Sequence, residues 1–86
     1  MKKSLSFVGV VIEDRKKEAG AVNKIFSDLG EIIVARMGIP YKERGCFVIS
    51  LVIDATTDEM KSLTGRLGAV PGVSVKSGAA KIKKQG

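Results

Sequence analysis

The side chains best suited to bind an anion are gathered around one predicted hairpin. They are Arg36, Tyr41, Lys42 and Arg44. Guanidinium groups beside a phenol can hold a carboxylate or a phosphate through charge-assisted hydrogen bonds. The alternative is a solvated loop whose cations pair with Glu43 and Glu31, an arrangement that contributes little stability. Arg36 is the strongest candidate of the four, because it interrupts an apolar strand face, where an unpaired charge is costly.

A second candidate site is the turn of Glu13, Asp14 and Arg15, which leads into a predicted helix. Free backbone N–H groups at the start of a helix can bind an anion, so Asp14 and Arg15 are candidate ligand-binding residues. Asp14 acting as the N-cap of the helix explains the same residue without any ligand. Both alternatives remain open at this point.

Residues for catalysis or metal binding are scarce. The chain has no histidine and one cysteine, Cys46, so it lacks the usual general base, the commonest metal ligand and any internal disulfide. Cys46 is either a redox sensor, a lone metal ligand or a small hydrophobic residue of a strand. Asp54, Asp58 and Glu59 are explained by strand termination and helix capping. We therefore expect no enzymatic activity, no metal and no cofactor.

The hydrophobic periods predict the order strand, helix, strand, strand, helix, strand. The predicted strands cover residues 5–12, 32–37, 46–53 and 73–76. The first helix starts near Arg15 and is ended by Gly30, and a capping box at residues 56–59 begins the second helix. Between the middle strands, Gly38, Pro40 and Gly45 indicate a polar hairpin connection.

This order predicts an α+β, ferredoxin-like βαββαβ fold, in which a four-stranded antiparallel sheet has both helices on one face. The third predicted strand is almost wholly apolar on both of its sides. The sheet face without helices should therefore expose apolar side chains, which is unusual for a monomer. We expect the chain to associate with itself as a homodimer or a homotetramer that buries this face or continues the sheet.

The chain of 86 residues should form one domain over residues 1–78, followed by a flexible basic tail over residues 79–86. No stretch predicts a membrane span or a secretory signal, so we expect a cytoplasmic protein. The net charge of +6 allows a second function class. This alternative is a polyanion-binding protein that uses the tail lysines with Arg36 and Arg44. Direct, sequence-specific DNA binding is not expected, because no helix-turn-helix or ribbon-helix-helix segment is found.

Several motifs resemble those of a small bacterial family, the iron-only hydrogenase system regulators. They are Arg36-Met37-Gly38-Ile39-Pro40-Tyr41, Arg44-Gly45, Val48-Ile49-Ser50-Leu51-Val52, Thr56-Thr57-Asp58-Glu59 and Pro71-Gly72-Val73-Ser74-Val75-Lys76. That family is similar to ACT-like regulatory domains and to the ligand-binding domain of nickel-responsive repressors. The resemblance implies an ACT-like fold, oligomers, and sensing of a small ligand or a protein partner at subunit boundaries. It implies a role as a transcriptional or hydrogenase-system regulator.

The sequence departs from the nickel-responsive repressors in two ways. Those proteins use histidines together with a cysteine near the start of the third strand, and only the cysteine, Cys46, has a counterpart here. A square-planar nickel site is therefore not expected. The DNA-binding segment that precedes the first strand in the repressors also has no counterpart. Regulation would then act through a regulatory protein partner or through ligand-controlled assembly.

Overall fold

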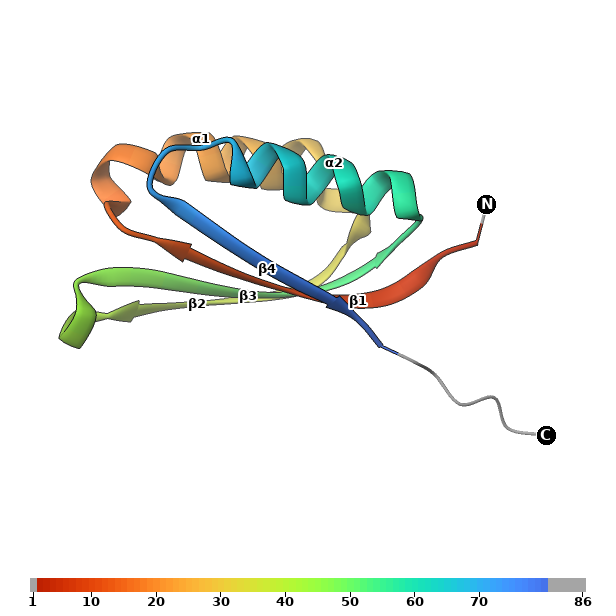
Figure 1. The fold of residues 1–86 in the computed structure, drawn as a ribbon, viewed down its shortest axis with the longest axis horizontal. Helices are drawn as coiled ribbons and strands as arrows, with labels where there is room; N and C mark the ends of the chain where they lie inside the picture. Colours follow the sequence, from red (N-terminus) through yellow and green to blue (C-terminus); the bar gives the residue numbers. More distant parts are fainter. Residues whose placement is uncertain (1, 81–86) are drawn as a thin grey trace.

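The computed structural model describes residues 2–80 of the chain. Its elements are β1 (Ser4–Ile12), α1 (Arg15–Asp28), the short 3₁₀ helix η1 (Gly30–Ile32), β2 (Ile33–Tyr41), the 3₁₀ helix η2 (Lys42–Arg44), β3 (Cys46–Ala55), α2 (Thr57–Gly68) and β4 (Val73–Ala79). The strands form one antiparallel sheet in the order β2-β3-β1-β4. Both helices lie on the same side of this sheet (Figure 1). The predicted ferredoxin-like fold is confirmed.

Both helices begin at the predicted caps. Asp14 has extended backbone angles, and its side chain accepts a hydrogen bond from the Lys17 N–H at 3.3 Å. At α2, the Glu59 N–H donates to Thr56 Oγ1 at 3.2 Å, and the Thr56 N–H donates to Glu59 Oε1 at 2.8 Å. These bonds satisfy backbone donors that the first turn of a helix leaves without partners. The bond from Thr56 lowers the pKa of the Glu59 carboxyl below its ordinary value.

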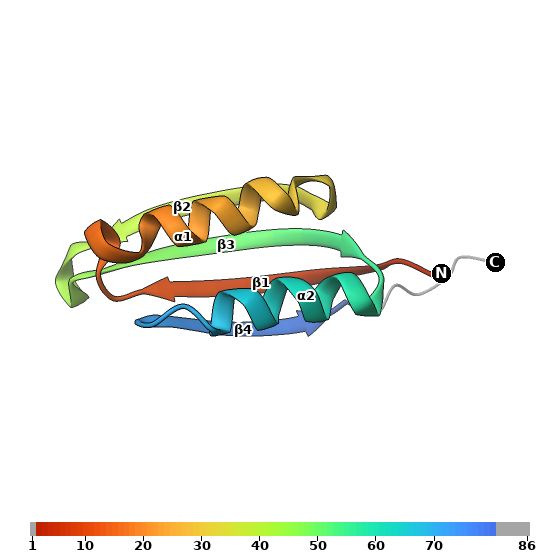
Figure 2. The ribbon, with the colours of Figure 1, turned by 90° about the horizontal axis from the view of Figure 1, so that it is seen from above.

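The core lies between the helices and the sheet face that they cover. Alternate residues of the two central strands point into it, and Figure 2, seen from above, shows these strands side by side between α1 and α2. The buried apolar residues of these strands are Val8, Val10, Ile12, Ile49, Leu51, Ile53 and Ala55, and they meet Val22, Ile25, Phe26, Leu63 and Leu67 from the helices. One face of each central strand is therefore covered over most of its length within a single chain.

The other sheet face is free of any described element, and we call it the open face (Figure 1). Strand register places on it Leu5, Phe7, Gly9 and Val11 of β1, Ala35, Met37, Ile39 and Tyr41 of β2, Cys46, Val48, Ser50, Val52 and Asp54 of β3, and Ser74, Lys76 and Gly78 of β4. Five large apolar side chains are exposed among the described residues, and four of them lie on this face: Phe7, Met37, Ile39 and Tyr41.

Strand β2 differs from the prediction in length and in register. It runs to Tyr41, so Gly38 and Pro40 belong to the strand and only residues 42–45 connect it to β3. Proline is tolerated because β2 is an edge strand, where a missing backbone donor breaks no bond in the sheet. Gly45 closes the connection in the left-handed conformation, at a φ of 63°.

A β-bulge between Ile33 and Ala35 also changes which way β2 faces. Simple alternation would put Ile33 on the same side as Ala35 and Met37. Instead Ile33 pairs with the buried Ile53, while Ala35 pairs with Val52 of the open face. The extra residue of the bulge reverses the alternation. It leaves Arg36 on the helix side of the sheet.

Strand β4 is longer than predicted, because it continues from Lys76 through Ala79 along β1. Beyond it, the Ala80 N–H donates to the Leu5 carbonyl at 2.8 Å. Ser77 and Gly78 have weak strand propensity, but an available partner strand determines their conformation. Lys81, Lys83 and Lys84 of the predicted basic tail lie outside the described residues.

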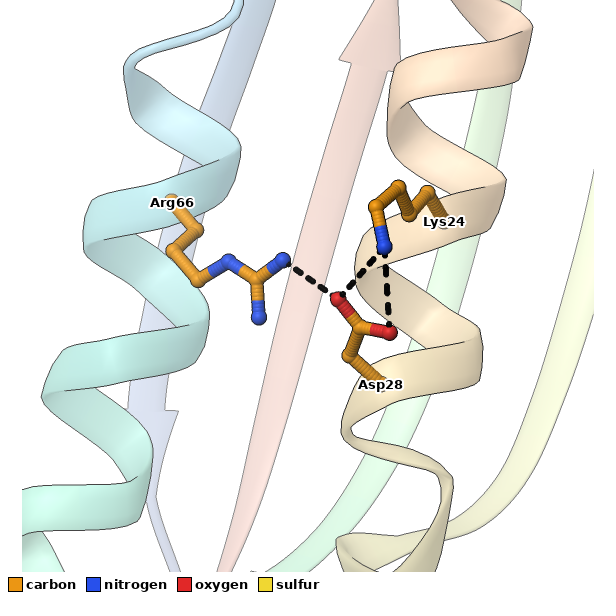
Figure 3. A network of polar contacts seen from close by, with 3 residues as sticks. All are labelled: Lys24, Asp28 and Arg66. Atoms are coloured by element: carbon orange, nitrogen blue, oxygen red, sulfur yellow. Dashed lines mark hydrogen bonds and ion pairs between the residues drawn. The ribbon is translucent and has the colours of Figure 1, made fainter.

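The two helices are joined on their outer surface by Asp28 of α1. Its carboxylate lies 2.7 Å from Arg66 Nη2 of α2 and 3.3 Å from Nζ of Lys24, one turn earlier in α1 (Figure 3). The hydrogen bonds from Arg66 and then from Lys24 lower the pKa of the Asp28 carboxyl. The contact ties together two helices that pack mainly on the sheet.

Candidate functional site

A narrow slot opens between α1 and the sheet, close to the end of β1. Its volume is about 140 Å³, and it is lined by Ile12, Arg15, Ala19, Val22, Asn23, Arg36, Phe47 and Ile49. Most of these side chains are apolar, and the polar ones are two arginines and one asparagine. An apolar slot with a few converging polar groups is typical of a small-ligand site.

Each arginine of the slot lies over a phenylalanine ring. The Arg15 Cζ atom is 4.4 Å from the ring centre of Phe47, and the Arg36 Cζ atom is 5.0 Å from the ring centre of Phe26. Such cation–π contacts orient the guanidinium planes. Within residues 2–80, ion pairs closer than 4.0 Å involve Lys24, Arg66 and Asp28 only. The donors of Arg15 and Arg36 are therefore without carboxylate partners in this part of the chain.

The predicted hairpin site does not assemble as expected. Tyr41 pairs with Cys46 on the open face, whereas Arg36 pairs with the buried Leu51 on the helix side. The prediction that Arg36 and Tyr41 converge was wrong, because β2 continues without interruption through Tyr41, and residues five positions apart in one strand lie on opposite faces of the sheet. Lys42 and Arg44 lie further on, in the η2 turn that ends the hairpin.

Of the two candidates in the first turn, Asp14 caps α1 and Arg15 lines the slot. The structure thus brings together Arg15 and Arg36, one residue from each predicted cluster. It also adds Phe47 and Asn23, which the sequence did not single out as site residues. Phe47 reaches the slot because it pairs with Ile12, the last residue of β1, three positions before Arg15. The proximity of Phe47 to Arg15 therefore becomes apparent only from the pairing of β1 with β3.

The Phe47 wall of the slot depends on a glycine of the neighbouring strand. A Cβ atom placed on Gly38 would lie 2.8 Å from Cζ of the Phe47 ring, closer than carbon atoms normally approach. The tip of the ring therefore lies close to the backbone of Gly38, and the Arg15 guanidinium lies over the ring. Gly38 positions this aromatic wall.

Two other hollows offer less specific chemistry. One, of about 310 Å³, is lined by hydroxyl groups of Ser4, Ser6, Thr57 and Ser77 with small or apolar neighbours, and carries no charged side chain. The second, of about 430 Å³, is a shallow depression of the open face over Phe7, Gly9, Ser50, Val52 and Lys76. Among the described residues, no three histidine, cysteine or carboxylate side chains are grouped to hold a metal ion. Cys46 is half-buried and unpaired within this part of the chain.

The fold places the chain in the structural class of small ACT-like domains. The ACT domain of the GTP pyrophosphokinase from Chlorobium tepidum superimposes with a TM-score of 0.74 at 23% identity, over 88% of this chain and 99% of that domain. A domain of a formyltetrahydrofolate deformylase from Pseudomonas putida KT2440 has the same fold. Its TM-score is 0.62 at 12% identity, and the match covers 88% of this chain and 29% of that enzyme.

Within this class the chain belongs to the TM1266-like family, provisionally described as iron-only hydrogenase system regulators, whose model matches residues 4–77. The solved structure of TM1266 from Thermotoga maritima, an uncharacterized protein, has a TM-score of 0.89. It is 34% identical, and the match covers 93% of this chain and all of that one. The resemblance inferred from the motifs is confirmed.

Curated proteins show no significant match. Across residues 2–80, the helices are too short and too polar to cross a membrane.

Proposed function

We propose that this chain is a non-enzymatic, cytoplasmic regulatory domain that associates with itself through the open face. In this assembly it senses a small anionic ligand or a regulatory protein partner. The observation that carries the proposal is the concentration of Phe7, Met37, Ile39 and Tyr41 on one uncovered sheet face. Large contiguous apolar patches on soluble proteins usually mark interaction surfaces. The provisional description of the family as regulators supports a regulatory role.

Stacking of two open faces is favoured over joining of sheet edges. The β2 edge carries a bulge and Pro40, and the β4 edge carries Lys76. Bulges, prolines and lysines all discourage the pairing of an edge strand with another chain. On a stacked pair, the apolar side chains of β1, β2 and β3 would form the centre of the contact. Lys76 would lie at its rim, where charged groups remain hydrated.

The contact can be tested with Met37→Glu. Met37 is 58% exposed on the open face, so a charge there leaves the folded chain intact but would be desolvated in a stacked pair. We expect light scattering to give the single-chain mass of 9.1 kDa for this variant and a multiple of it for the native protein. Ala21→Glu, an exposed position of α1, is the matched control and should keep the native mass. A Met37→Glu variant that keeps the native assembly would refute stacking through this face.

A further inference from the structure

The charged side chains that line the slot between α1 and the sheet are all positive, which limits the kind of ligand it can bind. Arg15 and Arg36 both line it, and its lining includes no acidic side chain. The contrast with the outer surface of the helices is direct, because Lys24 and Arg66 there share the carboxylate of Asp28. A bound anion would find two cations, whereas an ammonium group would find no carboxylate in the lining. The slot thus favours a net negative ligand over a zwitterion.

The apolar walls set the size of that ligand. The Phe47 ring, Val22 and Ile49 surround a volume of about 140 Å³. A cavity of about 150 Å³ lined by similar side chains is large enough to hold benzene. The ligand therefore has room for an apolar group of about the size of one aromatic ring, beside the arginines.

We propose that this slot binds a small organic carboxylate, made of one anionic group held by Arg15 and Arg36 and one apolar group seated against Phe47. The cation–π contacts at 4.4 Å and 5.0 Å hold the two guanidinium groups beside the slot without using their N–H donors in an ion pair, so these donors can bind a carboxylate. The Asn23 side chain, which also lines the slot, supplies an amide group to the ligand. This proposal rests on the proposed regulatory function and names its ligand class.

The slot and the open face share two strands. Arg36 lies between Ala35 and Met37, and Phe47 lies between Cys46 and Val48; these neighbours point to the open face. A ligand that contacts Arg36 and Phe47 therefore binds to β2 and β3, and the open face of these two strands is buried in the proposed assembly. If the ligand changes the affinity of the subunits for one another, assembly must change ligand affinity by the same factor.

The test uses the full chain and isothermal titration calorimetry with four probes. Benzoate has the proposed anion and ring, benzamide lacks the charge, phenylalanine is a zwitterion, and inorganic phosphate lacks the apolar part. We expect benzoate to bind with a Kd at or below about 1 mM and the other three probes at least tenfold more weakly. Absence of benzoate binding, or equal binding of any other probe, would overturn the proposal.

Charge-neutral variants locate the binding. Arg15→Gln and Arg36→Gln should each weaken benzoate binding about tenfold, because each removes a charged hydrogen-bond donor. Arg44→Gln removes the same charge from the η2 turn, outside the slot, and should leave benzoate affinity unchanged. Equal losses in all three variants would indicate diffuse attraction by net charge and reject the slot.

Two further measurements separate the outcomes. Circular dichroism shows whether each variant is folded; should Arg36→Gln unfold, Arg15→Gln decides, because Arg15 is exposed at the start of α1. Sedimentation of the same samples reports assembly independently of ligand binding. A chain that assembles but ignores benzoate rejects the ligand proposal alone. A monomer that binds benzoate rejects self-association and leaves the slot supported.

Discussion

The two faces of the same sheet have very different surroundings. On the helix side, Val10, Leu51 and Ile53 are at most 2% exposed. On the open side, their neighbours Val11 and Val52 are only half-buried, and Phe7 remains 51% exposed. One set of apolar side chains is thus covered by the folding of a single chain, and the other is left uncovered. The fold explains the burial of the first set, and the exposure of the second set is the reason for proposing self-association.

This contrast also separates the two candidate surfaces. The slot uses residues that the fold brings together, because Phe47 packs close to Gly38 and Arg36 lies over Phe26. The open face has no such supporting layer among the described residues. The slot is therefore formed within a single chain, whereas the open face is left uncovered by the described residues.

The largest expected effect compares adjacent residues of β3. Leu51→Ala should lower the free energy of unfolding by about 2–5 kcal/mol, because it leaves a cavity in the core. Val52→Ala, on the open face, should cost less than about 1 kcal/mol under conditions where the chain is monomeric. Urea unfolding of both variants at low protein concentration measures the difference. Equal losses would show that the open face is as important to the monomer as the core.

An intermediate effect compares two glycines of the edge strands. Gly38→Ala should lower the free energy of unfolding by about 1–3 kcal/mol, because its Cβ collides with the Phe47 ring on the helix side. Gly78 lies on the open face and has no atom within 4 Å of an added Cβ. Gly78→Ala should therefore be neutral or slightly stabilising by thermal unfolding. A neutral Gly38→Ala would mean that the ring moves aside easily.

The smallest expected effect concerns Asp28, which joins the two helices that cover the sheet. The pKa of Asp28 is lowered by Arg66 and Lys24, so its interactions stabilise the fold above the ordinary value of 3.8. That contribution is lost as the pH falls through the lowered folded value. Asp28→Asn should be slightly less stable than the native chain at neutral pH and equally stable at strongly acid pH. A stability difference that persists in acid would assign it to something other than the charge.

Much of the fold was predictable because its signals are local. Asp14 and the capping box at Thr56 mark helix starts within four residues of sequence. The third strand was also recognised, but Asp54 does not end it, because β3 continues to Ala55. The end of β2 and that of β4 were missed for one physical reason. Pro40 and Gly78 have low strand propensity, yet each is held in register by a neighbouring strand.

The candidate site was only partly predictable. Arg15 and Arg36 were both selected from the sequence, but as members of separate clusters. Their meeting depends on the bulge at Ile33/Ala35, which turns Arg36 to the helix side, and on the pairing of Ile12 with Phe47. Both are long-range features that no short motif encodes. The apolar character of the open face was predictable, because both sides of β3 are apolar in the sequence.

The measurement that tests the account most directly is the mass of the native chain in solution. Sedimentation equilibrium from micromolar to submillimolar concentration should give a whole multiple of 9.1 kDa, because the open face would be buried between subunits. A mass of 9.1 kDa across the whole range would contradict self-association through that face.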